Sequence, residues 1–188
     1  TADLAALRTA GIAALQAASF AALTSDQLPA LTTNQASALT TAQVALLAGE
    51  QVASLQTSDL AAIRSAAIAT LNSAGLAALT TVQFSALRTH QISALTTTQM
   101  PVLGTEQLAV MTSAQAAALS SIQVIALGSD QLAILGTSAL SALKTAVVNA
   151  LGTDQLTGLG TNQLAALTTS QLGALKTNQL PTLLTEQV

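Results

Sequence analysis

The chain has 188 residues, of which 51% are hydrophobic and only 7% charged, and its five basic and eight acidic residues give a formal net charge of −3. Many apolar residues and few charges exclude a disordered chain, and the small negative charge argues against a nucleic-acid partner. The lack of cysteine excludes disulfides and thiolate metal sites, and no apolar run is long enough to span a membrane.

The whole sequence repeats with a period of eight residues. Written in lines of eight from Thr1, it aligns to Val188 without an insertion, with the consensus T-x-Q-L-x-A-L-x. We number these lines octad 1 (residues 1–8) to octad 24 (residues 185–188), and the places within an octad positions 1 to 8. The pattern predicts one continuous repeat array over residues 1–188. Because neither end resembles a polar capping unit, we expect a fragment of a longer array.

The period of eight selects the backbone. One continuous helix is excluded, because at about 100° per residue its apolar stripe would rotate by about 80° with each octad. The apolar positions 4 and 7 would point to opposite faces of a strand, but they share one face of a helical turn. Ala, Leu and Gln also favour helix. We therefore expect an all-α solenoid of short helical turns, with a β-solenoid as the alternative.

Positions 1, 2, 3 and 8 suggest where each helix begins and ends. Position 1 is Ser or Thr in 22 of 24 octads, which predicts an N-cap. Acids at positions 2 and 3 would lie near the positive end of the helix dipole, and bases at position 8 near its negative end. Glycines at position 8 predict a left-handed residue that ends the helix. The acids are Asp26, Glu50, Glu106, Asp130, Asp154 and Glu186 at position 2 and Asp3 and Asp59 at position 3; position 8 holds Arg8, Arg64, Arg88, Lys144, Lys176, Gly104, Gly128, Gly136, Gly152 and Gly160.

The remaining positions predict the packing. Position 3 is Gln in 16 of 24 octads, which predicts either an amide ladder between successive coils or local capping of backbone groups, with exposed polar filler as the alternative. Positions 4 and 7 are expected to form the core, and the small position 6 is expected to lie where adjacent turns approach closely. Pro29, Pro101 and Pro181 at position 5 conflict with a regular α-helix, so those turns are 3₁₀-like or the frame is displaced by one or two residues.

The number of octads in each coil stays open. Acids and glycines that recur 24 residues apart suggest three octads per coil. The segment Thr1–Leu15 recurs at residues 57–71, which is 56 residues later and does not fit that number. We interpret the 56-residue recurrence as a duplication.

The sequence offers no catalytic, cofactor-binding or metal-binding residues, and we expect no enzyme activity and no cofactor. His90 is the one histidine; it occupies the variable position 2 and is expected to be exposed and inert. No nucleophile or orienting carboxylate accompanies it in the repeat, and no phosphate-binding loop or metal-ligand spacing is present. The carboxylates are interpreted as charges at helix ends.

The strings Leu31-Thr32-Thr33-Asn34-Gln35 and Leu39-Thr40-Thr41-Ala42-Gln43-Val44 resemble the LTTxQ[VL]xAL octapeptide runs of very large secreted or surface proteins of bacteria. This resemblance covers the whole chain and implies an extended, extracellular role. A local similarity to the first helix of TAL-effector repeats, L-T-P-x-Q-V-x-A-I, does not extend to their longer period, base-reading loop or basic stripe. We therefore expect no DNA binding.

These observations give one main functional hypothesis and two alternatives. The main hypothesis is a structural rod or filament-forming segment of a bacterial surface or secreted protein such as an adhesin, whose partners are neighbouring repeats or further copies of itself. The first alternative is a protein-binding module that uses the variable positions 2, 5 and 8. Ice binding by the Thr column is less favoured, because hydroxyls that cap helices are already occupied.

Overall fold

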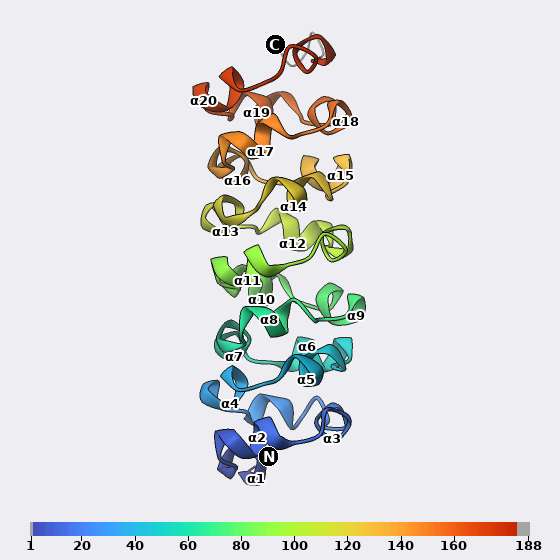
Figure 1. Cartoon of the computed structure of the whole chain (residues 1–188), viewed down its shortest axis with the longest axis vertical. Coiled ribbons are helices and arrows are strands. Elements are labelled where there is room, and N and C mark those ends of the chain that lie inside the picture. The colour runs from blue at the N-terminus through green and yellow to red at the C-terminus, as the bar shows by residue number, and fades with distance from the viewer. Residues whose placement is uncertain (1, 184–188) are drawn as a thin grey trace. The chain divides into compact units, whose positions relative to one another are not determined.

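The computed structural model describes residues 2–183, and within them it is all-α: short α-helices alternate with corners, three 3₁₀ helices occur and there is no strand (Figure 1). The α-helices are α1 (Ala2–Ala6), α2 (Thr9–Ala14), α3 (Ala17–Ala21), α4 (Thr33–Ser37), α5 (Thr41–Ala45), α6 (Gly49–Ser54), α7 (Thr57–Ala62), α8 (Ser65–Ile68), α9 (Ser73–Ala77), α10 (Thr81–Ala86), α11 (Thr89–Ala94), α12 (Thr105–Ala109), α13 (Ser113–Ala118), α14 (Ser121–Ile125), α15 (Ser129–Ala133), α16 (Thr137–Ala142), α17 (Thr145–Asn149), α18 (Thr153–Thr157), α19 (Thr161–Ala165) and α20 (Thr169–Gly173). The 3₁₀ helices are η1 (Leu28–Ala30), η2 (Met100–Val102) and η3 (Leu180–Thr182). The predicted helical class is confirmed, and the β-solenoid alternative is wrong.

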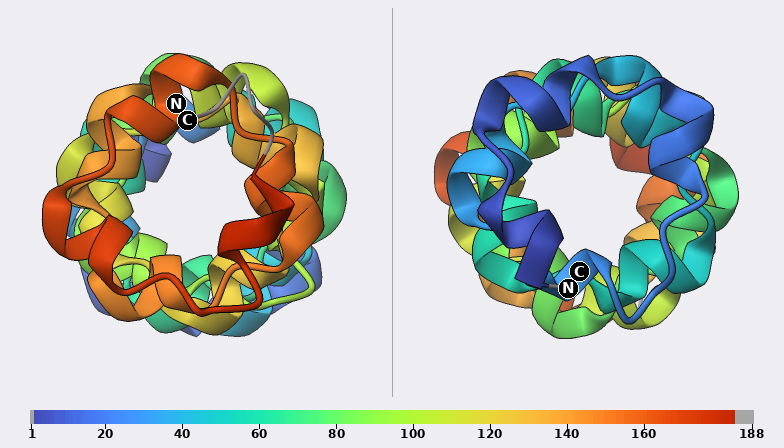
Figure 2. Two further views of the ribbon diagram at one scale, coloured as in Figure 1. Left: turned by 90° about the horizontal axis from the view of Figure 1, so that it is seen from above. Right: turned by 90° about the horizontal axis from the view of Figure 1, so that it is seen from below.

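The chain divides into two compact units, Thr1–Leu95 (unit 1) and Thr96–Val188 (unit 2). In unit 1, α4 packs on α7, α5 on α8 and α7 on α10; in unit 2, α13 packs on α16, α14 on α17 and α15 on α18. Each pair is three octads apart. Figure 2 (right) shows the blue N-terminal helices of unit 1 following one another around a ring. Short helices that cannot persist alone are thus held by the coil beside them, so each unit is an α-solenoid.

One turn of the solenoid contains between three and four octads. Helix α4 begins at Thr33 and packs on α7, which begins at Thr57, three octads later. The side chain of Gln43, by contrast, bonds backbone carbonyls 28 and 31 residues earlier in the chain, in the fourth octad before its own. Each octad therefore rests on two octads of the preceding coil.

The helix begins one residue earlier than the sequence suggested. The N-cap is position 8, as at Thr40, whose backbone is extended and whose hydroxyl accepts a hydrogen bond from the Gln43 backbone N–H at 3.2 Å. Position 1 is the first helical residue, so the prediction that its Ser or Thr is the cap is wrong. The physical reason is the Gln at position 3: it stands three residues after position 8, as a capping box requires.

This displacement also corrects the roles given to position 8. The bases Arg8, Arg64, Arg88 and Lys144 stand at the N-cap of the following helix instead of the C-terminal end of their own. The five glycines predicted to be left-handed have φ values between −62° and −74°, and no described glycine has a positive φ. Because position 8 leads into a new helix, an extended backbone is what it needs.

The acids and prolines follow the predictions more closely. Asp3, Glu50, Asp59, Glu106, Asp130 and Asp154 all lie in the first turn of their helices, as predicted. Asp26 lies in the turn before η1, and Glu186 falls outside the described residues. Each proline occupies a 3₁₀ helix, so both explanations offered for the proline conflict are correct: those turns are 3₁₀, and the frame is displaced by one residue.

The core consists of positions 4 and 7, as predicted, and each faces a different neighbouring coil. In the first coil, Ile12 and Phe20 at position 4 are fully buried, whereas Leu7 at position 7 is 43% exposed. Near the C-terminal end the position-4 side chains are open instead, with Leu180 52% exposed. Position 4 is therefore covered by the following coil and position 7 by the preceding one.

The small residues at position 6 lie where coils come close. A Cβ added to Gly49, at position 1, would stand 3.1 Å from the Ala78 Cβ, at position 6 three octads later. A Cβ on Gly158, at position 6, would stand 3.3 Å from the Ser129 Cβ. Positions 1 and 6 of neighbouring coils thus touch, which limits both to small side chains there.

Candidate functional site: a column of glutamine amides

The glutamines of position 3 form the most regular polar feature of the molecule, and most are buried. Gln91 is 0% exposed and Gln43 1%. An uncharged amide carries two donors and an acceptor, all of which need partners when it is buried. The interpretation of these residues as exposed filler is therefore wrong.

The amide oxygen caps the helix that carries it. In the described octads Oε1 accepts a hydrogen bond from the backbone N–H of position 8 at 2.6–3.0 Å, as Gln91 does from Arg88 at 2.8 Å. Where position 8 is Ser or Thr, its hydroxyl returns a bond to the Gln backbone N–H, which completes a capping box at Thr32, Thr40, Thr80, Thr112, Ser120 and Thr168. This is the local capping that the sequence predicted.

The amide nitrogen bonds the coil below. Gln91 Nε2 donates to the carbonyls of Leu60 and Ile63, at 2.9 and 2.7 Å, four octads earlier. In unit 2, Gln155 Nε2 reaches the carbonyls of Val124 and Leu127 at 3.1 and 2.8 Å. These acceptors lie at the end of a helix, where carbonyls lack an intrahelical donor. The predicted ladder between coils is thus confirmed, in the same side chains that cap the helices.

Comparison with protein-family models finds one repeat eight times along the chain: the ALTTAQ repeat, at residues 1–33, 52–89, 76–105, 85–121, 100–137, 124–161, 135–169 and 149–185. The chain belongs to the ALTTAQ repeat family. Two of the matches cross the boundary between units 1 and 2. No curated protein matches the chain.

The six letters of the ALTTAQ repeat correspond to six structural roles, visible in Ala38–Gln43. Leu39 at position 7 is fully buried, Thr40 at position 8 is the N-cap, and Thr41 begins the helix. Gln43 at position 3 closes the capping box and bonds the coil below. The ALTTAQ string therefore spans a corner, with the buried end of one helix and the capped start of the next.

The amide column is interrupted in three consecutive octads of unit 1, where position 3 holds Asp59, Ala67 and Gly75. In each case the side chain at the preceding position 8 reaches the carbonyls that Gln would have bonded. The substitute donors are Gln56 to the Pro29 carbonyl at 2.8 Å, Arg64 to that of Leu39 at 3.3 Å, and Asn72 to that of Leu47 at 2.9 Å. The sequence analysis missed these donors, although each lies three residues before a missing Gln.

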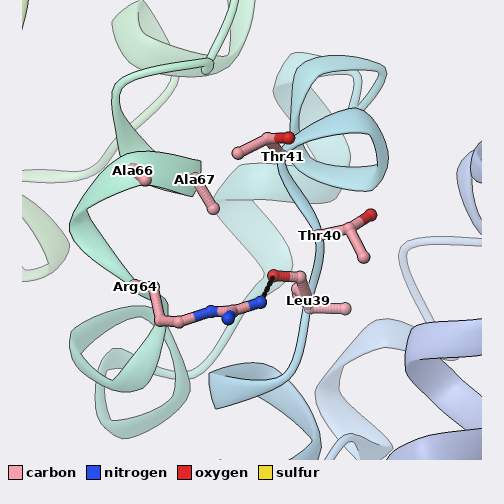
Figure 3. Close-up of a pocket in the computed structure, with 6 residues that line it drawn as sticks. All are labelled: Leu39, Thr40, Thr41, Arg64, Ala66 and Ala67. Atoms are coloured by element: carbon pink, nitrogen blue, oxygen red, sulfur yellow. Dashed lines mark hydrogen bonds between the residues drawn. The ribbon is translucent and has the colours of Figure 1, made fainter.

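At Ala67 the missing amide leaves a hollow of about 240 Å³. It is lined by Leu39, Thr40, Thr41, Arg64, Ala66 and Ala67, and Figure 3 shows the Arg64 side chain extending across it toward the Leu39 carbonyl. The lining is mostly methyl groups with one guanidinium. In unit 2 the column is interrupted differently, by the buried apolar residues Ala139 and Val147.

The remaining predicted features are distributed without a catalytic arrangement. His90 is exposed, as expected. Within residues 2–183, no group of three or more His, Cys, Asp or Glu side chains is placed to hold a metal ion. None of the described helices has the length and apolar character that a membrane crossing requires. Some position-1 hydroxyls, which do not cap, donate across coils instead, as Ser113 does to the Ser138 carbonyl at 3.1 Å.

Proposed function

We propose that this ALTTAQ array is a spacer: a rod- or filament-forming segment of a surface or secreted bacterial protein that holds other parts at a distance. The observation that carries the proposal is the amide column. Each coil presents the next with the same carbonyls, and each octad supplies the same Gln donor. An interface that repeats in this way is extended by adding octads, with no new contact to design.

The proposal is tested by changing the length of the array. Duplicating residues 33–88 inserts seven whole octads into unit 1. Helices on adjacent coils lie about 8–10 Å apart, so about two added coils should lengthen the particle by roughly 16–20 Å in small-angle X-ray scattering. A control that inserts four residues breaks the octad register and should lose helix content. A particle that grows in width instead of length would contradict the spacer.

The surface location is supported by the resemblance to octapeptide runs of large bacterial secreted and surface proteins. It is tested with single cysteines in the full-length protein. Val82 is 67% exposed and Val52 is fully buried, so Val82→Cys should react with a membrane-impermeant maleimide on intact cells while Val52→Cys stays unlabelled. Labelling of Val82→Cys only after lysis would contradict a surface location.

A protein-binding module is the second candidate, and an exposed apolar pair favours it. Ile122 and Ile125, three residues apart on α14, are 66% and 49% exposed. The two functions differ on deletion of whole octads: a spacer shortens in proportion, whereas a binding module loses its ligand abruptly. Ice binding stays a prediction, measured as thermal hysteresis; the objection that capping occupies the position-1 hydroxyls is wrong, because position 8 is the cap.

A further inference from the structure

Asp59 stands in the amide column where Gln is the rule. Its side chain is 2% exposed. One carboxylate oxygen, Oδ1, accepts hydrogen bonds from Thr33 Oγ1 at 2.8 Å and from Ser58 Oγ at 3.4 Å. The other, Oδ2, is buried and has no hydrogen-bond partner. An ionised carboxylate can only accept hydrogen bonds, so it cannot take over the donor role of the Gln amide.

The surface below Asp59 also consists of acceptors. In other octads Gln Nε2 lies 2.5–3.0 Å from the position-7 carbonyl four octads earlier. For Asp59 that carbonyl belongs to Leu31, and the described residues provide no hydrogen bond to it. Leu31 stands two residues before Thr33, whose hydroxyl holds the Asp59 carboxylate. Carboxylate and carbonyl oxygens therefore gather here without a hydrogen between them.

The shorter side chain leaves room between these oxygens. Asp lacks one methylene of Gln, so Oδ2 falls about 1.5 Å short of the amide nitrogen it replaces. Added to the usual amide distance, this sets Oδ2 roughly 4–4.5 Å from the Leu31 carbonyl oxygen. That is too long for an O–H···O bond. It matches two oxygens that share a cation at about 2.3–2.6 Å from each.

Charge decides which cation fits. A buried carboxylate without a counter-charge is costly. The nearest base in the same octad, Arg64, bonds the Leu39 carbonyl instead. With one carboxylate and otherwise neutral oxygens, a single positive charge balances the site, whereas a divalent ion leaves an excess. We propose that Asp59 Oδ2, the Leu31 carbonyl oxygen and Thr33 Oγ1 form a binding site for a sodium ion.

The site is tested by unfolding the purified chain in urea, followed by circular dichroism, in sodium chloride and in choline chloride of equal concentration. At a sodium concentration of about 100 times Kd, the folding equilibrium constant should rise about 100-fold over choline. The matched variant is Asp59→Gln, which restores the residue the column uses elsewhere and therefore folds. Its unfolding midpoint should be the same in both salts. Broadening of the ²³Na resonance by the natural chain, absent with Asp59→Gln, should accompany the shift.

Three results would overturn the proposal. The first is an equal midpoint for the natural chain in both salts. The second is a sodium response that Asp59→Gln retains, because the effect would then lie elsewhere. The third is millimolar calcium stabilising the natural chain more than sodium at the same ionic strength, which would contradict the charge argument. None of these results bears on the spacer proposal, which is measured by particle length.

Discussion

The contribution of the amide column to stability is measurable at Gln91. Its side chain is 0% exposed and makes three hydrogen bonds, one to the Arg88 N–H and two to the carbonyls of Leu60 and Ile63 in the coil below. Gln91→Leu keeps nearly the same volume and removes all three. At about 1 kcal/mol for each net hydrogen bond, unfolding should become easier by about 3 kcal/mol, and by more if the orphaned carbonyls stay dry.

Gln27 provides a matched control. It occupies the same position in η1's octad and makes the same cap, accepting from the Thr24 N–H at 2.9 Å, but it lies in the first coil and has no coil below it. Gln27→Leu should therefore cost only about 1 kcal/mol. The difference between the two variants, about 2 kcal/mol, is the contribution of the bonds between coils.

Urea unfolding monitored by far-ultraviolet circular dichroism measures both variants, because the chain has no Trp or Tyr to report by fluorescence. Hydrogen exchange of the Leu60 and Ile63 region adds a local reading, since repeat arrays do not always unfold in one step. Equal destabilisation by Gln91→Leu and Gln27→Leu would refute the reasoning: the column would then act only within its own octad.

Three further changes test the packing and the frame, all by the same unfolding measurement. Leu47→Ala removes a fully buried position-7 side chain and should cost about 2–5 kcal/mol. Gly11→Ala, whose Cβ would meet nothing within 4 Å, should stabilise α2 by about 1 kcal/mol, whereas Gly49→Ala, with a Cβ 3.1 Å from the Ala74 carbonyl oxygen, should destabilise. Thr80→Val removes the N-cap of α10 and should cost about 1 kcal/mol, while Thr81→Val should cost far less; the reverse order would contradict the corrected frame.

The helical class and the core could be predicted because they depend on local spacing. Positions 4 and 7 share a helical face but not a strand face, and the structure buries both. The choice of cap could not be settled by frequency. Ser or Thr is nearly constant at position 1 but mixed with Gly, Arg and Lys at position 8. The deciding signal is relational: Gln83 stands three residues after Thr80, and the two side chains cap each other.

The substitute donors show why the candidate site could only partly be predicted. Arg64 at a helix N-terminus is unfavourable for the helix dipole, which led the sequence analysis to place it at a C-terminus. Its reason for being there is a carbonyl 25 residues earlier, at Leu39, which is left without an amide donor because position 3 is Ala67. A contact of this kind requires the length of the coil to be known, and the sequence left that length open.

The length of the coil gives the 56-residue recurrence a geometric meaning that the sequence alone did not. With between three and four octads in each turn, seven octads close about two turns. A duplicated seven-octad block then lies above its original on the same side of the coil, so Arg8 and Arg64 share one side of unit 1 and each is followed by an octad without Gln. A block of three or four octads would land its interruption above intact Gln donors. Duplication and geometry are therefore one explanation, and other ALTTAQ arrays should repeat their interruptions in multiples of seven octads.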